Sequence, residues 1–263
     1  MIVSPTPLAS SGLSLVPATR TVVIIPGAGE CAEAWEGVAA TVQAEGIACI
    51  AVDLPMHGSN PDPQPDSIES YADWIEAFLV DRDLDNVVLA GHSMGSLIAL
   101  EIAGRGNTRV VESVLMTTGS PMSVAPFLLD LAATDAPEAC AFIGKYSMSA
   151  VTSDEIEARR RSHHALRLQA SASLLATDLH ACNNYTRAVE AAASTSVPTT
   201  VVVAEHDRMV PEKLATPIIE ALDDSRIIRL AQTGHAIQDE RQAEVAGILV
   251  SAAIGTASSR VTP

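Results

Sequence analysis

The sequence is poor in aromatic and in basic residues. Only 2 Trp, 3 Tyr and 3 Phe occur among 263 residues, and 16 Lys and Arg stand against 32 Asp and Glu, which gives a formal net charge of −16 with histidine neutral. A surface so acidic repels nucleic-acid backbones and anionic lipid headgroups, and so few rings offer little for base stacking. We therefore expect no nucleic-acid partner, no membrane partner, and a core of aliphatic side chains.

Cysteines are few and do not form a metal-binding pattern. Cys31, Cys49, Cys140 and Cys182 include no Cys-x-x-Cys pair, and no histidine stands at zinc-site spacing from them. Cys49 lies within an apolar run, where a buried and unreactive thiol is the common case. The sequence thus predicts no metal and no other cofactor.

Long uncharged apolar runs are missing as well. No stretch approaches the roughly 18 residues that a membrane helix needs. Residues 1–19 are interrupted by prolines and lack the basic start of a signal peptide. Hydrophobic residues nevertheless make up 48% of the chain, which is enough for a sizeable core. We expect a cytoplasmic globular protein with one domain, or one domain with an insertion, and leave open whether it forms a homodimer.

Strand-like and helix-like segments alternate along the chain, which indicates an α/β fold with a mostly parallel sheet. Expected strands cover residues 21–25, 48–53, 86–90, 111–117, 199–203 and 226–230, and expected helices include 35–44, 97–103, 214–222 and 242–253. Between residues 121 and 193 only helix-like segments occur. This pattern predicts a core domain of residues 1–120 and 194–263 and a helical cap of residues 121–193.

Two further helix starts are marked by polar residues three positions apart. Asp66 with Glu69 precedes one helical apolar pattern, and Thr152 with Glu155 precedes another within the expected cap. Such a spacing lets the first side chain accept a hydrogen bond from the third residue of the helix. We expect both pairs to mark helix N-termini.

The motif Gly-His-Ser-Met-Gly at residues 91–95 carries the main chemical signal. It directly follows an expected strand and directly precedes an expected helix, which is the setting of a nucleophile elbow. Glycines are needed there because the sharp turn leaves no room for neighbouring side chains. Ser93 is therefore the candidate nucleophile.

A serine hydroxyl needs a base, and the base needs a group that orients it. Asp207 and His235 each follow an expected strand, and the carboxyl ends of parallel strands meet at one edge of a sheet. The order Ser93, Asp207, His235 along the chain is the one expected for this class of site. Glu205 is an alternative acid, although Asp207 is favoured.

The negative charge that develops in acyl transfer must be met by N–H donors held in place. The residue after the nucleophile, Met94, is expected to supply one backbone donor. The glycine-rich turn at residues 26–29, which follows the first expected strand, is expected to supply the other from Ala28.

Together these segments resemble the α/β-hydrolase-fold serine hydrolases. The resemblance covers nearly the whole chain, through residues 26–29, 53–59, 91–95, 205–211 and 234–235. It implies a catalytic Ser93, Asp207 and His235, an oxyanion hole from the Ala28 and Met94 amides, and a helical cap inserted after the sixth strand. Pro26 stands where the family usually has histidine, and Met56 replaces a common glycine. A serine at position 93 speaks against the branches that use an aspartate nucleophile.

The expected function is hydrolysis of a small ester or related acyl compound, with a neutral or apolar substrate and no cofactor. Two alternatives stay open. The same three residues also serve C–C bond hydrolysis, lyase chemistry or acyl transfer in resembling proteins, and a hydrolase fold can be kept as a ligand-binding module without catalysis.

Overall fold

A parallel sheet of six strands lies at the centre of the computed structural model, which describes residues 20–149, 153–169 and 172–255. Its strands are β1 (Thr21–Ile25), β2 (Cys49–Ala51), β3 (Val87–His92), β4 (Val110–Met116), β5 (Thr199–Ala204) and β6 (Ser225–Leu230). Their order is β2-β1-β3-β4-β5-β6, and all neighbouring pairs are parallel. The expected α/β fold is confirmed, and each expected strand is present to within about two residues at either end.

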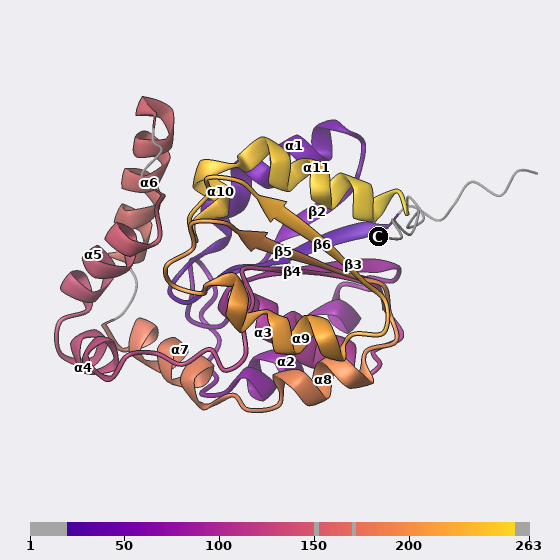
Figure 1. The fold of residues 1–263 in the computed structure, drawn as a ribbon, viewed down its shortest axis with the longest axis horizontal. Helices are drawn as coiled ribbons and strands as arrows, with labels where there is room; N and C mark the ends of the chain where they lie inside the picture. Colours follow the sequence, from indigo (N-terminus) through magenta and orange to yellow (C-terminus); the bar gives the residue numbers. More distant parts are fainter. Residues whose placement is uncertain (1–19, 150–152, 170–171, 256–263) are drawn as a thin grey trace, which may run out of the picture.

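Helices cover both faces of this sheet (Figure 1). One face carries α1 (Glu36–Ala44) and α11 (Gln242–Ala253), and the other carries α2 (Ile68–Asp81), α3 (Met94–Gly104), α8 (Ala188–Ser194) and α9 (Thr216–Ala221). Strands that are buried on both faces gain from apolar residues at every position. This explains why β1, β3 and β5 read as continuous apolar runs and do not alternate with polar residues.

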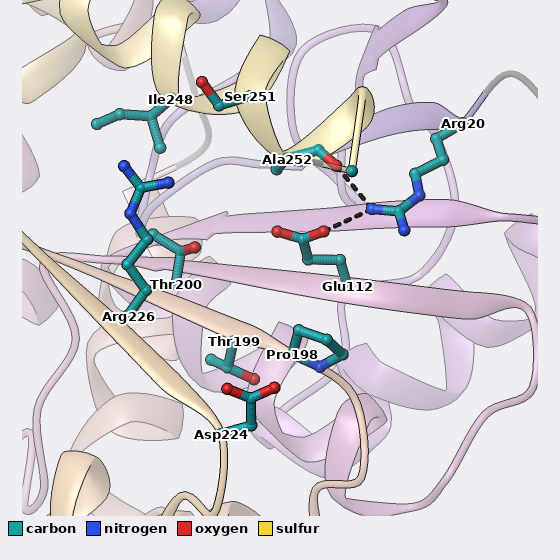
Figure 2. Close-up of a pocket in the computed structure, with 11 residues that line it drawn as sticks. Arg20, Glu112, Pro198, Thr199, Thr200, Asp224, Arg226, Ile248, Ser251 and Ala252 are labelled. Carbon is teal, nitrogen blue, oxygen red and sulfur yellow. Dashed lines mark hydrogen bonds and ion pairs between the residues drawn. The ribbon is translucent and has the colours of Figure 1, made fainter. Parts of the chain in front are cut away.

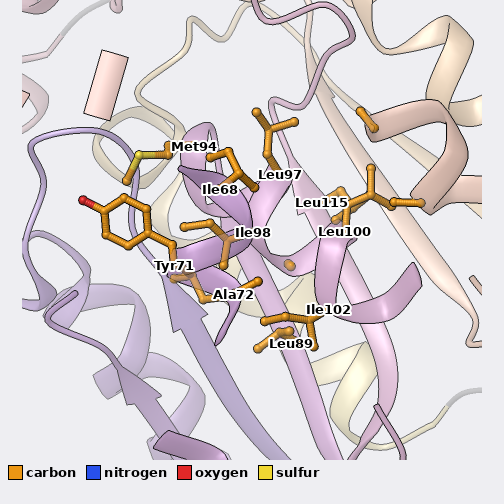
Figure 3. Packing of buried hydrophobic residues seen from close by; sticks show 14 of the residues in the cluster. Ile68, Tyr71, Ala72, Leu89, Met94, Leu97, Ile98, Leu100, Ile102 and Leu115 are labelled. Atoms are coloured by element: carbon orange, nitrogen blue, oxygen red, sulfur yellow. The ribbon is translucent and has the colours of Figure 1, made fainter. Parts of the chain in front are cut away.

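Helix α3 is held on all sides. Every residue from Met94 to Ala103 is buried. In Figure 3, Ile68 and Tyr71 of α2 lie beside Met94 and Ile98 of α3 in one apolar cluster. The first turn of α3, and Ser93 before it, therefore have a fixed position relative to the sheet.

The two predicted helix starts need correction. The cap of α2 is Ser67, whose side chain accepts from the N–H of Ser70, and not Asp66 with Glu69. Helix α6 (Asp154–Arg167) is capped in the same way by Ser153, which accepts from Ile156. Both serines have an extended backbone that directs the hydroxyl oxygen at the third N–H of the helix. Thr152 lies outside the described residues.

A helical segment separates β4 from β5. It contains α4 (Pro126–Thr134), α5 (Ala136–Tyr146), α6, α7 (Ala172–Asn184) and α8. The carboxyl ends of the strands point toward α4–α7 in Figure 1. The resemblance implied that the cap follows a sixth strand, but only four strands, β1 to β4, precede this segment in the described residues. The first strand of the described sheet begins at Thr21. None of the described helices has both the length and the apolar character needed to cross a membrane.

The C-terminal part of this helical segment packs on the core. Helix α8 lies against α3, and Ala181, Cys182 and Tyr185 at the end of α7 and just after it join the same apolar cluster as α2 and α3. Helices α4, α5 and the first part of α7 share a separate cluster of their own. The expected cap of residues 121–193 thus includes residues near its end that support the elbow helix.

Candidate active site

Ser93 occupies the tight turn between β3 and α3. Its backbone has φ 52° and ψ −117°, a strained conformation for a residue with a side chain. The N–H of Ser93 donates to the carbonyl of Met116 on β4 at 2.9 Å, which anchors the turn to the neighbouring strand. The Ser93 side chain is half-buried, so it lies at the surface of a site and not inside the core. The strand-turn-helix setting expected from the motif is present.

The two glycines of the motif are required by backbone contacts. A Cβ at Gly91 would lie 2.0 Å from the carbonyl oxygen of Gly95, and a Cβ at Gly95 would lie 2.2 Å from that of Ile25. Backbone atoms of a central strand and a buried helix do not move aside easily. The turn can therefore be this tight only with glycine at position 91, and α3 can come this close to β1 only with glycine at position 95.

We expect Gly95→Ala to lower the free energy of unfolding by about 2 kcal/mol or more, because the new methyl group meets the backbone of β1. Gly247→Ala on the exposed side of α11 is the matched control. Nothing lies within 4 Å of a Cβ there, and alanine favours a helix by up to about 1 kcal/mol over glycine. Urea unfolding of both variants measures the difference, and equal stabilities would contradict the steric argument.

His235 and Asp207 form a direct hydrogen-bonded pair. His235 lies between β6 and α10 (Ile237–Glu240), and its Nδ1 is 2.7 Å from Oδ2 of Asp207, which follows β5. The other carboxylate oxygen of Asp207 accepts the N–H groups of Met209 and Val210, each at 2.8 Å. Glu205 is exposed and accepts the N–H of Gln232 instead. The structure thus pairs His235 with Asp207 and not with the alternative acid.

The environment of Asp207 favours its ionised form. Burial by itself would raise the pKa of this carboxyl group, but the charge and hydrogen bond of His235 and the two backbone N–H groups lower the pKa below its ordinary value. Asp207 is therefore a carboxylate at neutral pH. A carboxylate at this position holds the proton of His235 on Nδ1 and leaves Nε2 free to accept one.

The histidine loop also contacts the elbow. His92, which directly precedes Ser93, donates from Nε2 to the backbone carbonyl of His235 at 3.0 Å, and the two imidazole rings are 5.0 Å apart. This contact places the His235 loop next to the turn that carries Ser93. The sheet thereby brings Ser93, Asp207 and His235 together at the carboxyl ends of β3, β5 and β6.

The turn after β1 approaches Ser93 from the other side. A Cβ at Gly27 would lie 3.3 Å from the Cβ of Ser93. The N–H of Gly27 donates to Glu30 and that of Gly29 donates to Asp178, whereas the N–H of Ala28 has no hydrogen-bond acceptor in the part of the chain that the structure describes. Met94 begins α3, where N–H groups lack partners within the helix. The two expected oxyanion donors, Ala28 and Met94, are thus both available.

Asp178 of α7 supports this turn and was missed by the sequence interpretation. Its fully buried carboxylate accepts from the N–H of Gly29 at 2.8 Å and from the hydroxyl of Tyr71 at 2.6 Å, and it contacts Nε2 of His57 at 2.9 Å and Nε2 of Gln64 at 3.1 Å. Burial alone would lower the pKa of His57, but the hydrogen bond and charge of Asp178 raise it. A single acid within an otherwise apolar segment, Leu-Leu-Ala-Thr-Asp-Leu, was the available signal.

Three other features of the described residues were candidates for a reaction centre and are less suited to one: a second cavity, possible metal ligands and the thiol of Cys49. The cavity in Figure 2 lies near Thr199 and Arg226, at the amino ends of β5 and β6. Ser93 lies at the opposite ends of the strands, beyond the carboxyl end of β3. Its Arg20 is paired with Glu112 and with the carbonyl of Ala252. Among the described residues, no three His, Cys, Asp or Glu side chains come together as metal ligands would. Cys49 is buried, and burial raises the pKa of its thiol to about 12.

Comparison with known proteins identifies the fold and the family. A family model described as "Alpha/beta hydrolase family" matches residues 22–248. The AB hydrolase superfamily protein YisY of Bacillus subtilis is 26% identical over 75% of this chain and 78% of its own, and an uncharacterized protein of Mycobacterium tuberculosis is 31% identical over 37% of this chain but only 29% of its own. An esterase from Exiguobacterium antarcticum superposes with a TM-score of 0.82 at 20% identity, covering 90% of this chain and 92% of the esterase. The chain therefore belongs to the alpha/beta hydrolase family.

Proposed function

We propose that this member of the family is a cofactor-independent serine hydrolase that acts on small carboxylic esters or related acyl compounds. The observation that carries the proposal is the buried His235–Asp207 pair, 2.7 Å apart, beside a serine in a strained elbow. Such a pair serves to accept a proton from a nucleophile and to return it to a leaving group. The esterase fold of the Exiguobacterium protein is consistent with this chemistry.

In the proposed reaction, the hydroxyl oxygen of Ser93 attacks the ester carbonyl carbon while Nε2 of His235 takes the hydroxyl proton. Asp207 stabilises the resulting imidazolium, and the amides of Ala28 and Met94 bind the oxyanion. The tetrahedral intermediate then collapses, and the alcohol leaves with the proton from His235. Water repeats the sequence on the acyl-enzyme, which releases the acid and restores Ser93.

The charge distribution favours neutral or apolar substrates. The chain carries a net charge of −16, which opposes the approach of polyanions such as acyl-CoA. Two arginines of α6 contribute little free positive charge, because Arg159 and Arg160 pair with Glu155 and Glu157 of the same helix. Arg167 is likewise paired with Glu30. An anionic substrate would therefore have to displace existing ion pairs to reach these three arginines, and only Arg161 of α6 has no ion pair with a described residue.

Labelling with a fluorophosphonate, followed by a panel of esters, thioesters and lactones of increasing chain length, tests this proposal. We expect one label per chain on Ser93 by peptide mass spectrometry, and turnover of short neutral esters with release of the free acid. Labelled protein that is silent on the whole panel would redirect the assignment to C–C bond hydrolysis, lyase chemistry or acyl transfer. Folded protein that is not labelled would favour a ligand-binding role and refute the serine mechanism.

A further inference from the structure

The buried carboxylate of Glu30 lies where three parts of the molecule meet. Oε2 accepts the N–H of Gly27 at 3.0 Å and the indole N–H of Trp35 at 3.3 Å, and it lies 3.4 Å from Nδ1 of His92. Oε1 accepts from Arg167 of α6 and from the side-chain amide of Gln238 on α10 at 3.0 Å. Glu30 thus contacts the turn at residues 26–29, here called the oxyanion turn. It also contacts α10 in the His235 loop region, and α6 of the helical segment.

These contacts reach both halves of the proposed machinery. Gly27 precedes Ala28, so a change in its hydrogen bond reorients the oxyanion turn. His92 holds the carbonyl of His235, and Gln238 lies on the helix that begins two residues after that histidine. Glu30 touches neither the reacting hydroxyl nor the His235 ring in the structure, so it acts on them through its neighbours.

Helix α6 places Arg167 beside this carboxylate, and the contacts of α6 with α10 and Glu30 lie along one polar face of the helix. Arg159 donates to the carbonyl of Asp239, His163 contacts the carboxylate of Asp239, and Arg167 pairs with Glu30, so the three contacts recur at every fourth residue. No residue of α6 is buried. Polar and ionic contacts therefore hold α6 in place over the site.

We propose that Glu30 is a positioning residue that fixes the oxyanion turn and the His235 loop relative to each other, and that Arg167 of α6 balances its charge. The inference rests on the function proposed above. It assigns a role in that reaction to a cap residue more than 130 positions away from Glu30 along the sequence.

The electrostatics of the cluster support this assignment. Burial would raise the pKa of Glu30, but the charge of Arg167 and the hydrogen bond from the N–H of Gly27 hold its pKa well below the usual range. Glu30 is therefore an anion at neutral pH, balanced by the guanidinium of Arg167. Removing either charge leaves the other unpaired in a buried setting close to His235.

The test compares Glu30→Gln, Arg167→Gln, the double variant and Arg161→Gln, with p-nitrophenyl acetate as the substrate. Arg161 is exposed on the same helix and has no ion pair with a described residue, so it is the matched control. Glutamine at position 30 keeps the shape and an acceptor oxygen. We expect Glu30→Gln to lower kcat by about 10- to 100-fold through misplaced groups, with a smaller change in KM, and Arg161→Gln to behave as the unmodified protein.

The pH profile separates positioning from a general loss of structure. The acidic limb of kcat/KM reports the protonation of His235 in the free enzyme. Charged or titratable groups around His235 are Asp207 after β5, His92 on β3, Asp239 and Glu240 on α10, His163 of α6 against Asp239, and then Glu30 with Arg167. Glu30→Gln leaves the positive Arg167 and should move this limb to lower pH by about half a unit, whereas Arg167→Gln should move it to higher pH by a similar amount. The double variant should return it near its original position.

Each result decides the question. Opposite shifts in the two single variants, in protein that is still folded at the assay temperature and still labelled on Ser93 by the fluorophosphonate, would support the assignment. Single variants that match Arg161→Gln in rate and in pH profile would overturn it, as would shifts of the same sign. If the unmodified protein is neither labelled nor able to hydrolyse the ester, the proposed function itself fails, independently of the role of Glu30.

Discussion

Replacing Ser93 with alanine is expected to lower kcat/KM for p-nitrophenyl acetate by about 10⁵-fold or more. The change removes the only hydroxyl that the proposed mechanism uses, and water cannot take its place next to His235 with the same geometry. Alanine meets the same backbone strain as serine at φ 52°, so the melting temperature should change little. Steady-state kinetics and thermal unfolding measure the two quantities.

Ser162→Ala on the exposed part of α6 provides the control for this experiment. This substitution also removes a serine hydroxyl, but from a helix close to the site. The activity of the variant should be unchanged. If Ser93→Ala retained more than about a tenth of the activity, a covalent Ser93 intermediate would be excluded. The reaction would then have to proceed by direct attack of water activated by His235.

The second large effect is expected from Asp207→Asn, which should reduce kcat by about 10⁴-fold. The amide has almost the same shape as the carboxylate, but it cannot stabilise an imidazolium and can present N–H instead of oxygen to Nδ1 of His235. The N–H groups of Met209 and Val210 can still be accepted by the amide oxygen, so the loop should keep its conformation. The variant should therefore fold and bind substrate normally.

Glu205→Gln is the matched control for Asp207→Asn. Glu205 lies two residues earlier in the same loop, is exposed, and accepts only a backbone N–H from Gln232 among the described residues. Its kcat should stay within about twofold of the original value, as is usual for a surface substitution that removes no buried contact. A large loss in Glu205→Gln with a small one in Asp207→Asn would reverse the assignment of the acid.

The parts of the fold that the sequence predicted well are those with a continuous local signal. Strands such as Thr199–Ala204 are buried on both faces, so their sequence is a run of β-branched and apolar residues without charged positions. Helix α11 was predicted at Gln242–Ala253 and is found there. The cap residues of α2 and α6 were each misplaced by one position. For α2, Ser67 competes with Asp66 for the cap position, and only the backbone angles decide between them.

In the candidate site, the sequence located the residues that follow strands and missed those that reach the site from elsewhere. Ser93, Asp207 and His235 each stand directly beyond a predicted strand, so the parallel sheet alone brings them together. Asp178 lies within α7 and does not have this property, and Glu30, although it follows the first strand, makes its contacts with residues that the strand pattern does not indicate. Their partners, Arg167 and Gly29 among them, are about 140 to 150 residues distant in the sequence, and only the packing of α6 and α7 on the core makes them neighbours.

The buried Asp178 also sets a limit for protein engineering. Caps are natural targets for exchange between related hydrolases, because loops and insertions vary more readily than the sheet that carries them. A chimaera that replaces α4, α5 and α6 but retains α7 would keep the contacts of Asp178 with Gly29, His57 and Tyr71. One that also replaces α7 would have to bring its own carboxylate to the same point, or leave the turn at residues 26–29 with a buried N–H that has lost its acceptor.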